Sequence, residues 1–394
     1  MKKIGAVLLL VILLAACSQQ SEPTQYLSAQ VLASSQHDTA FLSVSSNGSH
    51  LYVGGETRGS FVAPLQGQVD GVIRKYNGFT PIWTRQFGQP GGITLARSVL
   101  ANADGSVYIV GEELNYPSPF LSKYDRTGKL LWKKVFPSTS RSLFMNGKEI
   151  PHDAQGNLYI QVRNENKYVT NVLKFSATGS LLQTIFIDQT SNPATPQNTY
   201  SGDFAVDPAG NLYAVATVFR QFPGTTALQY DGILKRFNSK GQRIYTKNVC
   251  ATSDNDLIDH IAVDKSGNIY TTCLTYAPDF SSVIGSQSYK LNSSGNVVWS
   301  RSGNFSAIAL DTQNNSYVTY FTSSRDVYVE KYDPTGNLLW VMSFGGARFE
   351  SPTSIIVSDF VYVAGLSDDP ITFERDPFLA KIRKSDGGLV KIDQ

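Results

Sequence analysis

Residues 204–215 read FAVDPAGNLYAV, and residues 261–272 read IAVDKSGNIYTT. Close copies are SVLANADGSVYIV (98–110) and IPHDAQGNLYIQ (150–161), and weaker copies span 43–55, 307–320 and 354–365. In the seven copies one tyrosine takes the same place: Tyr52, Tyr108, Tyr159, Tyr213, Tyr270, Tyr317 and Tyr362. Self-similarity of this kind indicates a repeat architecture, and it organises everything else in the chain.

A second element follows each tyrosine, as in KYDRTGKLLWKK (123–134), KLNSSGNVVWSR (290–301) and KYDPTGNLLWVM (331–342). Its seven copies begin with Lys75, Lys123, Lys174, Arg236, Lys290, Lys331 and Lys381. Four copies carry a tryptophan at one place: Trp83, Trp132, Trp299 and Trp340. Because a residue that recurs in every repeat usually packs neighbouring repeats together, we interpret these tyrosines, tryptophans and basic stems as structural.

Both elements have the pattern of a β-hairpin. Short apolar runs flank a centre of the type D-x-x-G-N, in which Asp caps the turn and Gly or Asn tolerates positive φ. Two hairpins make four strands, and four strands at a period of about 50 residues are typical of a propeller blade. No segment has a sustained helical apolar period. The sequence therefore predicts an all-β fold, a seven-bladed β-propeller of four-stranded antiparallel blades.

The repeats resemble the bacterial β-propeller repeat called SBBP, with kinship to NHL-type blades. The resemblance rests on QVDGVIRKYN (68–77), WTRQFG (83–88) and QYDGILKRFN (229–238), and it covers residues 26–394. It implies a fold and says almost nothing about function, since such blades serve many tasks. The chain departs from the pattern at Gln183 in place of Trp, at Asn314 in place of Gly, and in a short turn at Ser358–Asp359.

The N-terminus reads MKKIGAVLLLVILLAAC (1–17). A basic start and a short apolar run are typical of a signal peptide, and the run is too short for a membrane span of about 20 residues. Its end resembles the lipobox of bacterial lipoproteins, which implies that residues 1–16 are removed and that Cys17 is lipidated. An ordinary secretory signal and a cytosolic chain with an apolar start are the alternatives. We expect a flexible tether over 17–25 and, because Ser18 follows the cysteine, the periplasmic side of the outer membrane if the host is Gram-negative.

Composition narrows the function classes. The chain has 394 residues, 17% of them charged, with a net charge of +2. Removal of Lys2 and Lys3 with the leader leaves 32 basic against 32 acidic residues. Nucleic-acid binding driven by bulk electrostatics is therefore excluded, and we expect no nucleic-acid partner.

The propeller ring needs a closing strand. Residues 26–32 stand where an extra outermost strand would precede the first repeat, so we predict that the N-terminus closes the ring. The alternative is that residues 389–394 supply this strand. The same topology puts the long, variable loops on one face of the ring, which we call the loop face, and the short hairpin turns on the other. Variable loops on a rigid scaffold are where binding usually occurs.

Two cysteines remain after the lipobox, Cys250 and Cys273. An exported chain with one cysteine pair suggests a disulfide, and both residues are expected at the same face in adjacent blades. Two buried free thiols are the alternative. The spacing does not fit a zinc site.

The loop face supplies our binding candidates, because Arg and aromatic residues anchor protein interfaces. They are Arg58, Phe61, Tyr116, Phe120, Phe219, Arg220, Phe222, Tyr276, Phe280, Phe373 and Arg375. The alternative is that these loops fold over their own blades.

Motifs for catalysis are few. The histidines make no metal-ligand spacing, and a G-x-S-x-G motif is absent. His152 and His260 fall near innermost strands and could face the central channel, whereas Asp254, Asp256 and Asp259 are expected to form a solvated loop. We therefore predict no catalytic residue, metal or cofactor. The expected function is a non-catalytic binding or scaffold module for an envelope protein partner, with an enzyme acting on a small molecule or glycan at the channel mouth as the alternative. A role in outer-membrane protein assembly would rest on fold analogy alone.

Overall fold

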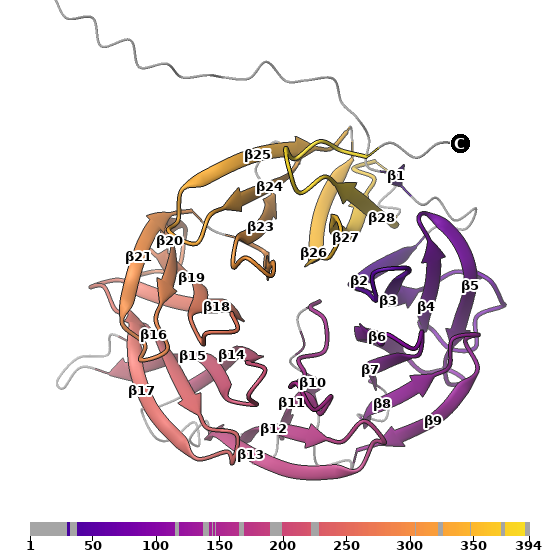
Figure 1. Cartoon of the computed structure of the whole chain (residues 1–394), viewed down its shortest axis with the longest axis horizontal. Coiled ribbons are helices and arrows are strands. Elements are labelled where there is room, and N and C mark those ends of the chain that lie inside the picture. Colours follow the sequence, from indigo (N-terminus) through magenta and orange to yellow (C-terminus); the bar gives the residue numbers. More distant parts are fainter. Residues whose placement is uncertain are drawn as a thin grey trace, which may run out of the picture.

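The computed structural model describes residues 30–31, 38–114, 118–136, 142–143, 145, 147–164, 169–189, 199–221, 228–303, 305–321, 326–346, 348–371 and 375–390. Over these residues the secondary structure consists of strands and turns, without a helix. The strands form seven four-stranded antiparallel sheets. Figure 1 shows the sheets arranged as the blades of a ring, with one edge of each toward the centre. The predicted fold class is confirmed.

The blades follow one another in chain order, each from its innermost strand outward. Blade 1 contains β2 (Thr39–Ser46), β3 (Leu51–Thr57), β4 (Asp70–Asn77) and β5 (Thr80–Phe87); blade 2 contains β6 (Thr94–Ala101), β7 (Val107–Glu113), β8 (Ser118–Tyr124) and β9 (Leu130–Val135). Blade 3 contains β10 (Ser142–Leu143), β11 (Leu158–Asn164), β12 (Val169–Phe175) and β13 (Leu181–Gln189); blade 4 contains β14 (Thr199–Val206), β15 (Leu212–Gln221), β16 (Leu228–Phe237) and β17 (Arg243–Cys250). Blade 5 contains β18 (Asn255–Val263), β19 (Ile269–Tyr276), β20 (Val283–Leu291) and β21 (Val297–Ser302); blade 6 contains β22 (Ala307–Leu310), β23 (Ser316–Phe321), β24 (Val327–Tyr332) and β25 (Leu338–Phe344). Blade 7 contains β26 (Phe349–Val357), β27 (Val361–Asp368), β28 (Arg375–Ile382) and, as its fourth strand, β1 (Gln30–Val31).

The N-terminal strand closes the ring, as predicted. Strand β1 pairs antiparallel with β28, with Gln30 opposite Leu379 and Val31 opposite Phe378. The C-terminal segment contributes one isolated bridge, between Ile382 and Leu389. Both ends of the chain therefore meet in blade 7, which covers an otherwise open sheet edge.

The hairpin turns have the chemistry that the sequence pattern predicts. In the turn 264–268 the amide of Gly267 donates to the carbonyl of Asp264 (3.0 Å), and the Asp264 carboxylate accepts from the Asn268 amide (2.9 Å). Asn314 replaces the turn glycine of blade 6 and adopts φ +64°, a conformation that asparagine tolerates better than most residues.

The repeated tyrosines join neighbouring blades. The Tyr52 hydroxyl donates to the carbonyl of Gly105 in the next blade (2.9 Å), and the Tyr108 hydroxyl donates to that of Ala177 (2.7 Å). The Lys75 ammonium lies 5.4 Å from the centre of the Tyr52 ring, an arrangement that recurs at Lys123, Lys174, Arg236, Lys290 and Lys331 with their own tyrosines. The structural interpretation of these residues is confirmed.

Blade 3 departs from the repeat on its inner side. The repeat pattern predicts an innermost strand near residues 150–153, but β10 lies at Ser142–Leu143, and His152 makes only an isolated bridge with Leu158. The Tyr159 amide donates to the Pro151 carbonyl (2.9 Å) and the Asp153 amide to the Asn157 carbonyl (3.1 Å), so the chain leaves the sheet after β10 and rejoins it at Pro151. Figure 1 shows this part of the chain reaching into the centre of the ring.

Candidate functional site

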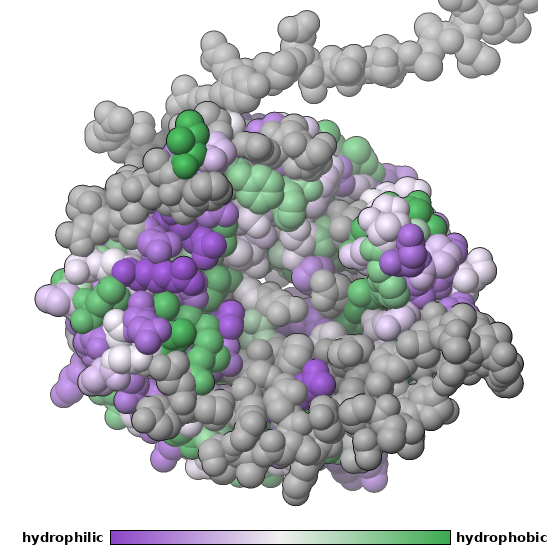
Figure 2. Space-filling view, turned by 180° about the vertical axis from the view of Figure 1, so that it is seen from behind, coloured by the Kyte–Doolittle hydropathy of each residue, from purple (hydrophilic) through white to green (hydrophobic). Residues whose placement is uncertain are grey.

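Two loop-face candidates of blade 5 lie together with a tyrosine of blade 4. The Phe280 ring lies 4.9 Å from Tyr230, edge to face, and 5.7 Å from Tyr276. Phe280 is 41% exposed and has φ +58°. Figure 2 shows the back of the ring, where hydrophilic and hydrophobic residues lie side by side around a central hollow. The structure thus brings Tyr276 and Phe280 together with Tyr230, which the sequence did not single out.

Three other candidates lie apart from this cluster. The Arg74 guanidinium lies 4.0 Å from the centre of the Phe61 ring, within blade 1. Arg375 pairs with Asp368 of its own blade (3.1 Å) and with Glu56 of blade 1 (3.9 Å). Arg58 is exposed. The expectation that Phe120 lies on the surface is wrong: it is 1% exposed and packs against Phe87, because the strand alternation turns it into the interface between blades 1 and 2.

Some candidates fall outside the described residues. These are Cys17, Tyr116, Phe222 and Phe373. Phe219 and Arg220 belong to β15, but their side chains also lie outside the described part.

The two cysteines connect blades 4 and 5. Cys250 ends β17 and Cys273 lies in β19, and the structure joins them in a disulfide with Cα atoms 6.1 Å apart. Both residues are buried in the apolar cluster between these blades. The disulfide therefore links two neighbouring repeats covalently.

Residues 147–150 cross the central channel, and we call them the channel segment. Ser43 donates to the Lys148 carbonyl (3.2 Å), and the Ile150 amide donates to the Val99 carbonyl (3.1 Å). Gly147 has φ +66°, and a Cβ there would lie 2.2 Å from the Thr353 carbonyl oxygen of blade 7. The segment thus contacts inner strands from several sides of the ring, and position 147 accepts only glycine.

Two charged side chains of the channel segment are paired inside the ring. Lys148 forms an ion pair with Asp203, and Glu149 accepts a hydrogen bond from the Ser45 hydroxyl. Burial lowers the pKa of Lys148, against the pull of Asp203, and burial raises the pKa of Glu149. These charges hold the segment in the channel.

The two histidines considered for the channel have separate contacts. His152 is exposed, with Nδ1 3.3 Å from the Ile150 carbonyl oxygen, and the His260 ring lies 6.3 Å from that of Phe305. Within the described ranges, no group of three or more His, Cys, Asp or Glu side chains is arranged to hold a metal ion. The same ranges contain no helix that is long and apolar enough to span a bilayer.

Blade interfaces, which we call seams, are packed with apolar residues at almost every position of the ring. In seam 6/7, Phe344 packs edge to face on Phe378 at 5.7 Å, with Val329 and Val361 fully buried beside them. Comparable clusters of described residues fill seams 1/2, 2/3, 3/4, 4/5 and 7/1.

Seam 5/6 differs at three aligned positions. Where seam 6/7 has Val329, Phe344 and Val361, seam 5/6 has Ser288, Gly303 and Ser316. The other blades carry apolar residues at the same places: Ile73, Leu121, Val172, Leu234 and Leu379 correspond to Ser288; Phe87, Phe136, Ile187 and Val249 to Gly303; Leu51, Val107, Leu158, Leu212 and Ile269 to Ser316. No cluster of buried described apolar residues spans this seam.

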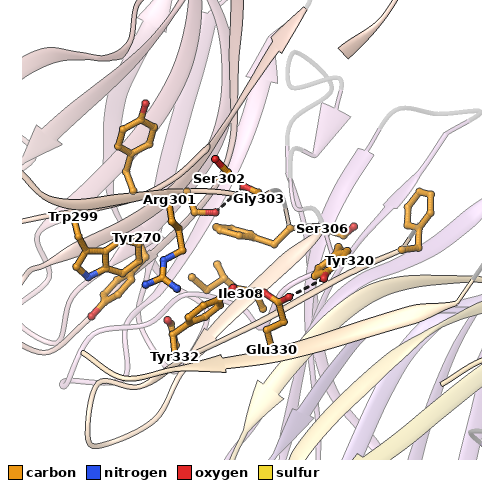
Figure 3. Close-up of a pocket in the computed structure, with 16 residues that line it drawn as sticks. Tyr270, Trp299, Arg301, Ser302, Gly303, Ser306, Ile308, Tyr320, Glu330 and Tyr332 are labelled. Atoms are coloured by element: carbon orange, nitrogen blue, oxygen red, sulfur yellow. Dashed lines mark hydrogen bonds between the residues drawn. The ribbon is translucent and has the colours of Figure 1, made fainter. Parts of the chain in front are cut away.

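A pocket of about 480 Å³ occupies seam 5/6 (Figure 3). This volume lies within the range of about 300–1,000 Å³ that is usual for small-molecule sites. Aromatic side chains form much of the lining: Tyr270, Tyr289, Trp299, Phe305, Tyr320, Phe321 and Tyr332. Figure 3 shows the guanidinium of Arg301 and the carboxylate of Glu330 directed into the space between them. Because these three positions lack large apolar side chains, an aromatic and polar lining is exposed.

Arg301 and Glu330 are held by aromatic neighbours. The guanidinium carbon of Arg301 lies 4.7 Å from the centre of the Trp299 ring and 4.0 Å from that of Tyr332. The Glu330 carboxylate accepts from the Tyr320 hydroxyl (2.8 Å) and from the Tyr332 hydroxyl. Burial and the nearby carboxylate raise the pKa of Tyr332 to about 12, so its hydroxyl stays a donor at neutral pH.

Arg301 is also used differently from its counterpart in blade 1. Arg85 donates from Nε to the Gly128 carbonyl (2.7 Å) and from Nη2 to that of Thr127 (3.0 Å), both in the next blade. The Nε of Arg301 is shielded from solvent and makes no such hydrogen bond to the next blade. The guanidinium instead lies against Trp299 and Tyr332 and lines the pocket.

Sequence reasoning missed this pocket. The signal was present in the aligned repeats, where Ser288, Gly303 and Ser316 interrupt otherwise apolar columns. This signal points to a pocket only when it is known that these three aligned positions face the same seam.

Comparisons with known proteins show the fold and no family. No family model matches the chain, and no curated protein matches it. Among solved structures it is similar to an ulvan lyase from a new polysaccharide lyase family (10% identity, 93% of this chain and 97% of that chain, TM-score 0.58) and to the extracellular domains 1–2 of Drosophila semaphorin 1a (9%, 90% and 88%, 0.51). A prolyl endopeptidase matches at 12% identity and TM-score 0.51 over 91% of this chain, which spans about half (49%) of that protein. Enzymes and non-enzymes therefore share the architecture.

Proposed function

We propose that this chain is a non-catalytic binding module that is held at the cell envelope by lipid on Cys17 and takes its ligand into the pocket of seam 5/6. The observation that carries the proposal is the joint loss of apolar side chains at three positions of one seam. An unfilled seam lowers stability, so a pocket with a polar and aromatic lining favours a functional origin.

The position of the channel segment favours seam 5/6, and not the channel mouth, as the ligand site. Inner strands from several blades contact this segment, which occupies the region where a channel enzyme would bind substrate. Among the described pocket-lining residues Glu330 is the single carboxylate, whereas glycoside hydrolysis in its usual form uses two.

The test compares the natural protein with a filled variant, Ser288→Leu/Ser316→Val, which restores residues that other blades carry at these places. Saturation-transfer NMR with a library of small polar, aromatic and sugar fragments would detect binding. Fragments that bind the natural protein and not the filled variant support the proposal. A library without such a fragment overturns it.

A protein partner on the loop face is the second candidate, and the cluster Tyr230, Tyr276 and Phe280 favours it. In-cell crosslinking of the natural protein beside Phe280→Ser would test it, with Leu131→Ser, an exposed residue on the outermost strand of blade 2, as the control. A partner lost only with Phe280→Ser supports the interface. Equal capture by all three proteins contradicts it.

Lipidation is tested separately at Cys17. Metabolic labelling with a radioactive fatty acid should mark the natural protein and not Cys17→Ala, and only the natural protein should fractionate with membranes. Membrane association of Cys17→Ala without label would contradict the anchor.

A further inference from the structure

We infer that the pocket of seam 5/6 binds a neutral saccharide of one or two sugar rings, an inference that rests on the proposed function of this pocket as a ligand site.

Charge balance points to a neutral ligand. Arg301 and Glu330 are the charged residues among the described lining, one cation and one anion. An anionic ligand would gain from Arg301 and be repelled by Glu330, and a cationic ligand would meet the reverse. A neutral ligand meets neither repulsion and can use both groups.

Hydrogen-bonding capacity points to adjacent hydroxyls. Each oxygen of Glu330 accepts from one tyrosine hydroxyl, and a carboxylate offers about four acceptor sites in total. The guanidinium of Arg301 lines the same pocket and carries further N–H donors on its two Nη atoms. A sugar hydroxyl both donates and accepts, so neighbouring hydroxyls of one ring can bind Glu330 and Arg301 together.

The aromatic lining accounts for the rest of a sugar. The face of an aromatic ring carries partial negative charge, which attracts the slightly positive C–H groups on the flat side of a pyranose. Phe321 of blade 6 lines the pocket and is 44% exposed, and Tyr289 lines it from blade 5. A planar aromatic solute would use these rings but would make no hydrogen bond to the guanidinium of Arg301 or to the free acceptor sites of Glu330.

The experiment titrates the full-length protein with N-acetylglucosamine, N,N′-diacetylchitobiose, maltose and lactose, and follows heat and tryptophan fluorescence. Glucuronate and indole serve as the anionic and the planar aromatic probe. Glu330→Gln, which keeps the side-chain shape, is expected to weaken saccharide binding by about tenfold or more, because a charge-assisted hydrogen bond is lost. The control Glu56→Gln, on blade 1, should leave binding unchanged.

The filled variant Ser288→Leu/Ser316→Val distinguishes loss of the site from misfolding, since it should bind no saccharide while unfolding at a higher temperature. Binding of indole or glucuronate without any saccharide would overturn the saccharide assignment and leave the pocket as a ligand site. Saccharide binding that survives in the filled variant would overturn the assignment to this seam. If no probe binds the natural protein, the inference is overturned; the fragment library above then decides whether the pocket is a ligand site at all.

Discussion

Seams 5/6 and 6/7 flank the same blade, but one is open and the other is closed. Equivalent strands of the repeat form both seams, and they pair in the same register: Lys290 lies opposite Trp299, and Lys331 lies opposite Trp340. Seam 6/7 fills the space with Val329, Phe344 and Val361, whereas seam 5/6 leaves it to an aromatic pocket. The difference shows that a pocket can form between two blades of a propeller where small side chains replace apolar ones, with no change in backbone topology.

The largest effect is expected from a truncation in the closed seam. Phe344 is 4% exposed, so Phe344→Ala should lower the free energy of unfolding by about 3–5 kcal/mol through the cavity that it leaves. Phe321 lines the open seam and is 44% exposed, so Phe321→Ala should cost less than about 1 kcal/mol. Urea unfolding measures both changes. Equal losses of unfolding free energy in the two variants would contradict the view that seam 6/7 is closed and seam 5/6 open.

The disulfide gives seam 4/5 a third kind of interface, closed and cross-linked. Its cysteines are 23 residues apart, so Cys250→Ala/Cys273→Ala should lower the free energy of unfolding by about 3 kcal/mol. Thermal unfolding of this variant beside the natural protein measures the loss. A change too small to detect would show that apolar packing alone holds blade 5 to blade 4.

Filling the open seam should stabilise the protein. Ser288→Leu/Ser316→Val adds apolar groups in buried positions and should raise the free energy of unfolding by about 1–2 kcal/mol, less the hydrogen bond from Ser288 to the Gly303 carbonyl. The reverse change in the closed seam, Val361→Ser, is the matched control and should destabilise. If the filled variant is less stable than the natural protein, the seam is not underpacked.

The smallest effect concerns Gly303, whose φ is +133°. An added Cβ would meet no atom within 4 Å, so Gly303→Ala should cost about 1 kcal/mol through backbone strain alone. Urea unfolding of this variant beside the natural protein measures the change. A loss of more than about 3 kcal/mol would contradict a purely local backbone cost.

The fold could be predicted because the contacts that form each blade are made by residues close together in the sequence. The turn Asp264–Asn268 and the pair Tyr270–Lys290 are examples. The number of times this pattern recurs gives the number of blades. The N-terminal closing strand was also predicted, with residues 389–394 as the alternative. The sequence could not decide between the two segments, because a strand that pairs through only two residues leaves little pattern.

Non-local contacts explain what the sequence did not predict. The channel segment interrupts the inner strand of blade 3, where Lys148 and Glu149 find partners in blades 4 and 1, far away along the chain. Phe120 was expected on the surface, but its neighbour across the seam, Phe87, comes from another repeat. Prediction of the pocket would have required an alignment of the repeats and knowledge of which aligned positions face one another across a seam.

The two-residue pairing of β1 also has a mechanical consequence. A pull on the N-terminal end of the chain enters the ring through β1, and the load falls first on the pairs Gln30–Leu379 and Val31–Phe378. Phe378 and Leu379 themselves belong to packed clusters in seams 6/7 and 7/1. A force on the N-terminal strand would therefore break two backbone pairs at the edge of blade 7 before it reached the apolar clusters of these seams.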